Sequence, residues 1–223
     1  MILRFAVLPR WLGGPRFQAG DLLGVLAPGA TAPRFYSLAS SARDGFVEIC
    51  VRKVPGGVCS PWLYALQPGD RLRAFTRRNQ AFPDAPESVV MISAGCGIGP
   101  MAGLLRGAAP GAERTLYFGL RDPPSDFLYA EELSGWLRDG RLTRLRTAVS
   151  RAAAGHDRGH VQHRLREDAA RLRQQIARSA RVLVCGSVAM GRSVATEFDA
   201  VLAPAGLSVA ALKREGRYVE DIY

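Results

Sequence analysis

The chain has 223 residues and a formal net charge of +10; 48% of its residues are hydrophobic and 22% are charged. These proportions exclude a disordered or fibrous chain, because enough apolar side chains are present to offset the entropy lost on folding. No apolar run approaches the ~18 residues of a membrane span, and the first residues lack a small-residue cleavage site, so we expect a cytoplasmic protein.

The first part of the chain consists of short apolar stretches separated by turn sequences. Strands are predicted at residues 22–26, 35–38, 46–51 and 71–75. Gly- and Pro-containing turns such as Ala-Pro-Gly and Pro-Gly-Gly separate them. Residues 81–87 contain two prolines and two acids and read as a linker. We therefore predict a first domain, residues 1–82, built as a small antiparallel barrel.

The positive charge is concentrated in this first part. Residues 1–80 hold 11 basic and 4 acidic residues, a net +7, and nearly all of the basic residues are arginines. Such a charge suits nucleic acid, an anionic cofactor or an acidic protein partner. No continuous Arg/Lys block and no nucleic-acid reading module is present, so we do not expect nucleic-acid binding.

After the linker, strands and helices alternate. Strands are predicted at residues 89–94, 115–120, 141–149, 181–185 and 207–212, and helices at 101–108, 128–137, 160–177 and 190–202. Alternation with strongly apolar strands predicts a doubly wound parallel sheet for a second domain, residues 83–223. Ligands of such sheets bind beyond the carboxyl ends of the strands. The arginine-rich stretch 164–178 is expected to be a solvated helix face.

Three local patterns suit a ligand that carries phosphates and a flat ring. The turn from Gly95 to Pro100 follows a predicted strand and opens a helix, which lets backbone N–H groups approach a phosphate. Arg34 and Tyr36 lie on one face of an extended strand, a cation beside an aromatic ring. Residues 55–63 read as a glycine turn entering a helix with Ser60 as N-cap, a start that suits a pyrophosphate. Taken singly, each also fits a purely structural role: a tight turn, a half-buried tyrosine and an ordinary capped helix.

Cysteine and histidine spacing indicates no metal site. The four cysteines, Cys50, Cys59, Cys96 and Cys185, contain no C-x-x-C pair. The histidines at positions 156, 160 and 163 have helical spacing, but Gly155 and Gly159 flank the first of them and interrupt any helix. We expect neither a bound metal nor a disulfide.

In combination, the motifs resemble the ferredoxin–NADP reductase superfamily, in particular the diflavin branch of sulfite reductase flavoproteins and cytochrome P450 reductases. Arg34-Phe-Tyr-Ser37 is similar to the R-x-Y-S flavin motif of that family. By this resemblance Arg34 would hold the FAD phosphates, Tyr36 would stack on the isoalloxazine, and Ser37 would lie near its N5. Further FAD contacts are implied at a second strand and at a pyrophosphate loop: Cys50, Val51, Gly57, Val58, Cys59 and Ser60.

The second part continues the resemblance toward an NADPH site. The turn Gly95-Cys96-Gly97 with Pro100 is similar to G-T-G-x-A-P, with Cys96 in place of Thr. Arg121 resembles a dinucleotide-contacting arginine. Ser150 and Arg151 resemble the pair that reads the 2′-phosphate, and a K-x-Y-V-Q-like stretch follows them: Arg158, His160 and Gln162. A phosphate at a strand end requires cations and hydroxyls, in agreement with these residue types.

The last candidates lie at the end of the chain. Cys185 and Gly186 are similar to the C-G-D motif, with Ser187 in place of the acid, and the thiol would sit beside the nicotinamide C4. Asp221 would complete a polar cluster with Ser37 and Cys185, and Tyr223 would cover the flavin opposite Tyr36. Without the resemblance, Cys185 reads as a buried strand-end thiol and the terminus as a frayed tail.

The resemblance implies an NADPH-dependent flavoprotein reductase with FAD and NADP(H) as cofactors. Hydride would pass from the nicotinamide C4 to the flavin N5, and single electrons would pass on to an acidic flavodoxin-like or FMN-bearing partner. Ser37 and Asp221 would manage the proton at N5, while Cys185 and Tyr223 would position the rings. Only 33 residues precede Arg34, which leaves open that the first barrel strand is missing and that the chain is the C-terminal part of a longer, membrane-anchored reductase.

Three other interpretations stay open at this point. The same fold serves free flavin or ferric reductases. A basic nucleic-acid-binding module would show salt-sensitive DNA binding and no flavin colour. A degenerate interaction module without flavin is suggested by the departures at Cys96, His160 and Ser187.

Overall fold

The computed structural model describes residues 1–8, 13–80, 82, 88–151 and 158–223. The chain forms two compact units: Met1–Asp84 together with Gly99–Gly107, and Ala85–Ile98 together with Ala108–Tyr223. The division falls within the predicted linker, most of which lies outside the described residues. Helix α2 (Ile98–Gly107), which follows the glycine turn of the second unit, belongs almost wholly to the first unit. The functional assignment of residues 1–82 and 83–223 to two cofactors stays a prediction.

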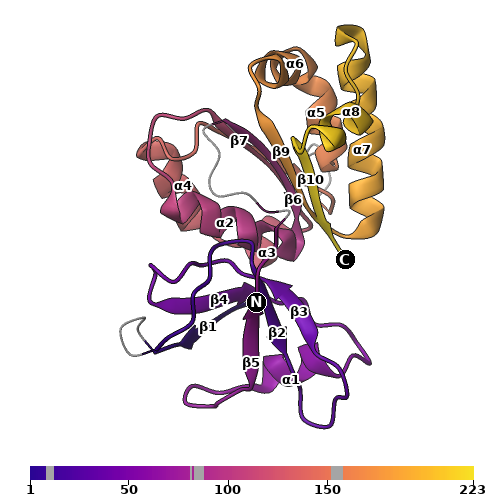
Figure 1. Ribbon diagram of the computed structural model, residues 1–223. Helices are drawn as coiled ribbons and strands as arrows, with labels where there is room; N and C mark the ends of the chain where they lie inside the picture. The colour runs from indigo at the N-terminus through magenta and orange to yellow at the C-terminus, as the bar shows by residue number, and fades with distance from the viewer. Residues whose placement is uncertain (9–12, 81, 83–87, 152–157) are drawn as a thin grey trace. The chain divides into compact units, whose positions relative to one another are not determined.

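The first unit contains two antiparallel sheets (Figure 1). One pairs β1 (Ile2–Ala6) with β4 (Phe46–Cys50), and the other has the order β3 (Arg34–Ser37), β2 (Leu22–Val25), β5 (Ala74–Arg77). An isolated bridge between Leu38 and Ile49 connects them. The predicted antiparallel pairing is confirmed, whereas closure into a barrel stays a prediction. β1 had no counterpart among the predicted strands; it pairs with β4 along its whole length.

The core of the first unit lies between these sheets and the short helix α1 (Cys59–Ala65). It is formed by alternate strand residues and one helical leucine, all almost completely buried: Leu23, Val25, Val47, Ile49 and Leu63. Alternation of this kind buries one face of each strand and leaves the other face available for other roles.

The second unit is a five-stranded parallel sheet with the order β10 (Tyr218–Ile222), β9 (Arg181–Gly186), β6 (Val89–Ala94), β7 (Arg114–Leu120), β8 (Arg144–Val149). The predicted parallel sheet is confirmed. From β6 the chain proceeds outward to β7 and β8 and then returns to the other side of β6 for β9 and β10. The order therefore reverses between β6 and β9, the place where α/β sheets bind ligands at their carboxyl ends.

Helices cover both faces of this sheet (Figure 1). One face packs against α5 (Val161–Glu167), α6 (Ala169–Ala177), α7 (Val188–Leu202) and α8 (Val209–Arg214), with a core that includes Ile92, Val184 and Phe198. The other face carries α4 (Ala130–Arg138), which buries Leu133 and Trp136. Short segments complete the unit: the 3-10 turns Gly95–Gly97 and Ala203–Ala205, and α3 (Pro123–Asp126).

Two predicted elements are wrong. The single helix predicted at 160–177 is two helices, α5 and α6, which meet at Asp168. The strand predicted at 207–212 is helix α8, because Ser208 caps it by accepting a hydrogen bond from the N–H of Ala211 at 3.2 Å. The fifth strand is instead β10, formed by the terminal segment and paired in parallel with β9.

Candidate functional site

The centre of the candidate site is the sheet edge where the strand order reverses. β6 runs into Gly95, Cys96 and Gly97, while β9 ends on Cys185 and Gly186. Gly95 has a φ of +55°, a conformation that favours glycine. A Cβ at Gly97 would overlap the carbonyl oxygen of Cys185 and lie 2.6 Å from its carbonyl carbon. The two loops therefore touch through backbone atoms, and only glycine fits at position 97.

Cys185 and Asp221 are adjacent across β9 and β10. They are register partners, and the thiol Sγ lies 3.8 Å from the Asp221 carboxylate Oδ2. The Cys185 side chain is almost completely buried, whereas Asp221 is half-buried. The structure thus brings together two of the predicted catalytic residues, a soft thiol and a carboxylate, beside the glycine turn.

The end of the chain is part of the sheet. The Tyr223 N–H donates to the Gly186 carbonyl at 3.0 Å, and the Val188 N–H donates to the Tyr223 carbonyl at 3.1 Å. The Tyr223 side chain is 56% exposed. The interpretation as a frayed tail is therefore wrong, because backbone hydrogen bonds fix the terminal residue next to Gly186. Ser187, the departure from the family motif, caps α7 by accepting from the Met190 N–H at 3.3 Å.

A second group of predicted residues lies at the carboxyl ends of β7 and β8. The N–H of Ser150 donates to the Leu120 carbonyl at 3.0 Å, and the N–H of Arg151 donates to the Arg121 carbonyl at 2.9 Å. Both arginine side chains are exposed. The carboxylate of Asp126 accepts from the N–H groups of Arg121 and Asp122, each at 2.9 Å, so it caps the turn. The backbones of these two strand ends are therefore adjacent, with two exposed arginines, while the Ser150 hydroxyl itself donates to the Leu120 carbonyl at 3.4 Å.

The segment that starts α5 adds further residues to this edge. Arg158 forms a parallel bridge with Val149 at the end of β8, and the Gly159 N–H donates to the Val149 carbonyl at 3.0 Å. The Arg158 side chain is exposed and Gln162 is half-buried. His160 precedes the helix, and its N–H donates to His163 Nδ1 at 3.4 Å. These two histidines thus serve the helix start; His156 lies outside the described residues.

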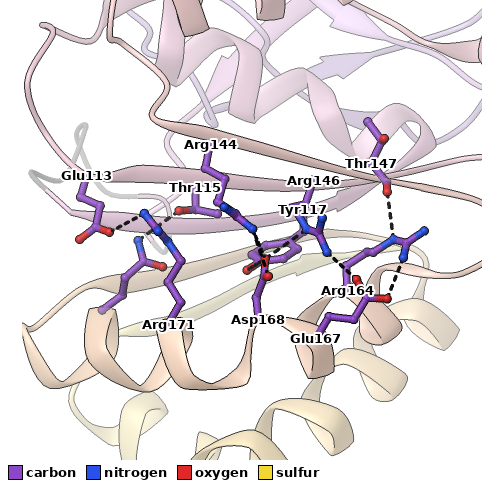
Figure 2. A network of polar contacts seen from close by, with 11 residues as sticks. Glu113, Thr115, Tyr117, Arg144, Arg146, Thr147, Arg164, Glu167, Asp168 and Arg171 are labelled. Atoms are coloured by element: carbon purple, nitrogen blue, oxygen red, sulfur yellow. Dashed lines mark hydrogen bonds and ion pairs between the residues drawn. The ribbon is translucent and has the colours of Figure 1, made fainter.

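A partly buried polar network, which the sequence analysis missed, holds α5 and α6 against the sheet (Figure 2). The Tyr117 hydroxyl of β7 donates to the Asp168 carboxylate at 2.9 Å. Arg144 and Arg146 of β8 reach the same carboxylate at 3.1 Å and 3.2 Å. Burial and the negative charge of Asp168 raise the pKa of Tyr117, so the hydroxyl stays a donor. Asp168 is where the single predicted helix divides, and its side chain points at the sheet.

The same network continues into the last turn of α5 (Figure 2). Arg164 donates to the Thr147 carbonyl at 3.2 Å and to Glu167 at 2.7 Å, and Glu167 also pairs with Arg146. The Arg164 side chain is only 13% exposed. The expectation that residues 164–178 form a solvated face is therefore wrong at Arg164. The sequence feature that could have indicated this network is the alternation of Arg144 and Arg146 with apolar residues in β8.

In the first unit, the predicted flavin residues of β3 divide between the two faces of the strand. Arg34 is paired with Val25 and Tyr36 with Leu23, on the core-facing side, whereas Ser37 is paired with Leu22. The Tyr36 side chain forms a hydrogen bond with Cys59. Burial and this hydrogen bond raise the pKa of Tyr36, while the nearby charge of Arg34 lowers it. Tyr36, Arg34 and Cys59 are thus brought together.

The predicted pyrophosphate loop is a compact turn with a different cap from the one expected. Helix α1 begins at Cys59 with Val58 at the N-cap position. Ser60 Oγ instead accepts from the Val54 N–H at 3.0 Å, and the Gly57 N–H donates to the Val54 carbonyl at 3.0 Å. The prediction that Ser60 is the N-cap is wrong, because its hydroxyl closes the preceding turn.

Cys50 and Val51 lie at the end of β4. The Cys50 thiol packs against α2, where a Cβ at Gly99 would lie 3.2 Å from Sγ. The Val51 side chain is buried in the core, and its backbone exchanges hydrogen bonds with Met1. A direct role for these two residues in flavin binding stays a prediction. So does the predicted closeness of Ser37 and Tyr36 to Cys185, Asp221 and Tyr223, because those residues belong to different units.

Part of the positive charge of the first unit is used internally. The completely buried Glu48 carboxylate pairs with Arg106 of α2 at 2.9 Å and with Arg4 of β1. Arg106 also donates to the Ala39 carbonyl at 2.6 Å. Both guanidinium groups lie over the Phe46 ring, at 4.8 Å for Arg4 and 5.5 Å for Arg106. This cluster fixes α2 to the antiparallel unit.

In the described part of the chain, no helix is long and apolar enough to cross a membrane. No three His, Cys, Asp or Glu side chains in that part are grouped as metal ligands would be. The four cysteines, all within the described part, form no disulfide with one another.

The reversed parallel sheet, its glycine turn and the cations at its carboxyl edge define a dinucleotide-binding domain. Residues 91–196 match the family described as oxidoreductase NAD-binding domain. Human NADPH–cytochrome P450 reductase is 32% identical over 225 residues, covering 85% of this chain and 33% of that protein. The sulfite reductase [NADPH] flavoprotein alpha-component of Vibrio vulnificus is 31% identical over 236 residues, covering 93% of this chain and 37% of that protein.

The inducible nitric oxide synthase of the dog is 32% identical over 243 residues, covering 93% of this chain and 21% of the synthase. The chain belongs to the ferredoxin–NADP reductase superfamily. It spans about a third of the length of the P450 reductases and sulfite reductase flavoproteins that it matches.

Proposed function

We propose that this chain is an NADPH-dependent flavoprotein reductase that binds FAD on the first unit and NADPH on the second. The observation that carries the proposal is the carboxyl edge of the parallel sheet. There the glycine turn and the Cys185–Asp221 pair lie at the ends of β6 and β9, and the exposed Arg121 and Arg151 follow β7 and β8. The relatives, whose names describe NADPH-dependent reductases, support the same function.

The dinucleotide would lie along this edge. The glycine turn would let a pyrophosphate approach the backbone N–H groups that precede α2, since Gly95 carries no side chain and nothing lies within 4 Å of its Cβ position. Ser150, Arg151 and Arg158 would hold the 2′-phosphate, because cations and a hydroxyl stabilise a dianion better than water does at this exposed position. At the other end of the ligand, Cys185 would lie against the nicotinamide, with Asp221 as the neighbouring proton acceptor.

The flavin would lie on the first unit. Arg34 fits a phosphate, and the half-buried ring of Tyr36, held by Cys59, fits the flat isoalloxazine. Bound FAD supplies the chemistry that protein side chains lack, namely acceptance of hydride at N5 and release of single electrons. The chain's own residues orient the rings and exclude water, and Ser37 would hold the proton at N5.

A flavin-reduction experiment tests this function. The purified chain is reconstituted with FAD under anaerobic conditions, and the flavin band near ~450 nm is followed after additions of NADPH or NADH. We expect bleaching that is faster with NADPH. The variant Cys185→Ala should bleach at least about tenfold more slowly while keeping its affinity for the 2′-phosphate end, which is measured with 2′,5′-ADP. Failure to take up FAD, or uptake without bleaching, would contradict the proposal.

The acceptor is proposed to be an acidic flavodoxin-like or FMN-bearing protein, since the first 80 residues carry a net +7. Comparison of flavodoxin with free FMN and with ferric citrate as acceptors separates this role from that of a free flavin or ferric reductase. A protein acceptor should be reduced with a rate that falls steeply as ionic strength rises, and the small acceptors should not show this dependence.

A further inference from the structure

The sheet β3–β2–β5 has an unusual outer face. Its inner face packs on the core through Leu23 and Val25. Residues on the opposite face of such an antiparallel sheet are normally polar. Here they include Leu26, Phe35 and Phe75, which are 40%, 40% and 50% exposed. We call this surface the Phe35–Phe75 face. Contiguous exposed apolar side chains of this kind mark interaction sites.

The two aromatic rings are held in place by the sheet. Gly24 of β2 is the register partner of both Phe35 and Phe75. A Cβ at Gly24 would lie 2.5 Å from the Phe75 ring, so the absence of a side chain there lets the rings meet. Their centroids are 5.9 Å apart with planes at 87°, and the Arg77 guanidinium lies 4.1 Å from the Phe35 centroid. A preorganised aromatic pair with an arginine is the composition of an interface hot spot.

The charge around the Phe35–Phe75 face is positive. Arg73 and Arg77 are exposed on β5 or next to it, and the Arg73 carbonyl accepts from the Leu26 N–H at the edge of the face. No ion pair joins either arginine to a described acidic residue. The nearby acids are engaged elsewhere: Asp70 accepts from the Gln67 N–H at 2.8 Å, and the buried Asp21 accepts from the Asn79 N–H at 3.0 Å.

The face includes one residue of the proposed flavin site, Ser37, whereas Arg34 and Tyr36 lie on the other side of β3. Phe35 and Ser37 lie on the same side of β3, because alternate strand residues share a face. Leu22 of β2 has Ser37 as its partner on one side and Arg77 on the other. A protein seated over the two phenylalanines would therefore approach the residue that is proposed to lie near the flavin N5.

We propose that the Phe35–Phe75 face is the docking surface for an acidic electron-acceptor protein. The phenylalanine rings provide the apolar centre of the contact, and Arg73 and Arg77 pair with carboxylates at its rim. The acidic chemistry of the partner follows from these two exposed arginines, which pair with no acidic side chain among the described residues, and its role as acceptor rests on the proposed function. A second copy of this chain fits less well, since the chain itself carries +10.

The test measures binding separately from turnover. The FAD-loaded chain and oxidised flavodoxin are titrated by calorimetry at low and moderate salt, for the wild type, Phe75→Ser and Arg77→Gln. We expect Kd to rise about tenfold or more in both variants, with Arg77→Gln also reducing the salt dependence. The control Arg43→Gln removes an exposed charge from the β3–β4 connection and should change Kd less than about twofold.

Each outcome decides the proposal. NADPH bleaching of the flavin should stay within about twofold of the wild type in all three variants, because none of them removes a proposed cofactor contact. Unchanged flavodoxin binding in Phe75→Ser and Arg77→Gln would overturn the docking surface while leaving the reductase function intact. Self-association of the wild type that Phe75→Ser abolishes, seen by sedimentation, would overturn it in favour of a dimer interface. Absence of NADPH bleaching would overturn the proposed function and, with it, the acceptor role of the partner.

Discussion

Gly97 and Cys185 are in backbone contact, although one follows β6 and the other lies in β9. The close approach leaves no room for a side chain at Gly97, since a Cβ would lie 2.6 Å from the Cys185 carbonyl carbon. The two strands that flank the reversal of the sheet are therefore tied together at their carboxyl ends. A ligand bound there would meet backbone N–H groups and the Cys185 thiol at positions fixed by this contact.

The first prediction concerns this contact. Gly97→Ala should destabilise the protein by about 1–3 kcal/mol, because the neighbouring Cys185 carbonyl belongs to the backbone and cannot turn away. It should also weaken NADPH binding, since the turn must shift. Gly107→Ala is the control: a Cβ there meets no atom within 4 Å at the end of α2, and alanine favours the helix. Urea unfolding and NADPH titration of both variants check the prediction; equal stabilities would contradict it.

The second prediction compares two buried tyrosines. Tyr117→Phe removes a hydrogen bond to the Asp168 carboxylate and should cost about 1.5–3 kcal/mol. Tyr218 has a buried hydroxyl with no hydrogen-bond partner among the described residues, so Tyr218→Phe should be neutral or stabilising by up to about 1 kcal/mol. The free energies of unfolding in urea at neutral pH provide the measurement. A larger loss at Tyr218 than at Tyr117 would show that the hydroxyl environments are misassigned.

The third prediction follows from the raised pKa values of the same two residues. Burial raises the pKa of both tyrosines above that of tyrosine in the unfolded chain. The negative charge of Asp168 adds to this effect at Tyr117, and the charges of Glu220 and Asp199 add to it at Tyr218. Below pH ~10 both tyrosines are protonated in the folded and in the unfolded chain, and their contribution to the free energy of unfolding is fully present. Above it the unfolded state loses its protons first, so stability should fall by about 1.4 kcal/mol per pH unit for each tyrosine. Urea unfolding between pH 9 and 11 should show a shallower fall in Tyr218→Phe, and an unaltered slope would refute the shift.

The fourth prediction concerns the buried carboxylate of the first unit. Glu48→Ala leaves Arg106, whose side chain is 17% exposed, without its buried partner and should destabilise by about 3 kcal/mol. Arg4→Met should cost only about 1 kcal/mol or less, because the Arg4 side chain is 52% exposed and water replaces the pair. Thermal unfolding of the two variants distinguishes them. Equal effects would indicate that Arg106 does not depend on Glu48.

The fifth prediction addresses the choice of dinucleotide. Arg151→Ala should raise the KM for NADPH by about tenfold to hundredfold, because a charged hydrogen bond to the 2′-phosphate is lost. The KM for NADH, which has no 2′-phosphate, should be nearly unchanged. Arg181→Ala is a matched control, since Arg181 is exposed at the amino end of β9, the opposite edge of the parallel sheet. Steady-state flavin reduction with each dinucleotide gives both constants. A parallel rise for NADH would mean that Arg151 stabilises the fold instead of reading the 2′-phosphate.

Errors in the sequence-based predictions have definite physical causes. The pattern of residues 207–212 is apolar enough for a strand, but the hydroxyl of Ser208 caps a helix there. The stretch 160–177 is periodic enough for one helix, but Asp168 turns to the sheet to meet Tyr117 and Arg144. In both cases a tertiary or capping hydrogen bond outweighed the local pattern.

The parallel sheet, the glycine turn after its first strand and the family could be predicted from local sequence, because turn glycines, apolar periodicity and motif order are encoded in neighbouring residues. Which charged side chains are internal could not be predicted in this way and depends on the fold. Tyr117 and Asp168 are 51 positions apart, and Glu48 and Arg106 are 58 positions apart. Only the three-dimensional chain path brings such residues together, since no local pattern relates a carboxylate to a partner so distant in sequence. The same applies to the Phe35–Phe75 face, where two strands 40 residues apart share one glycine between them.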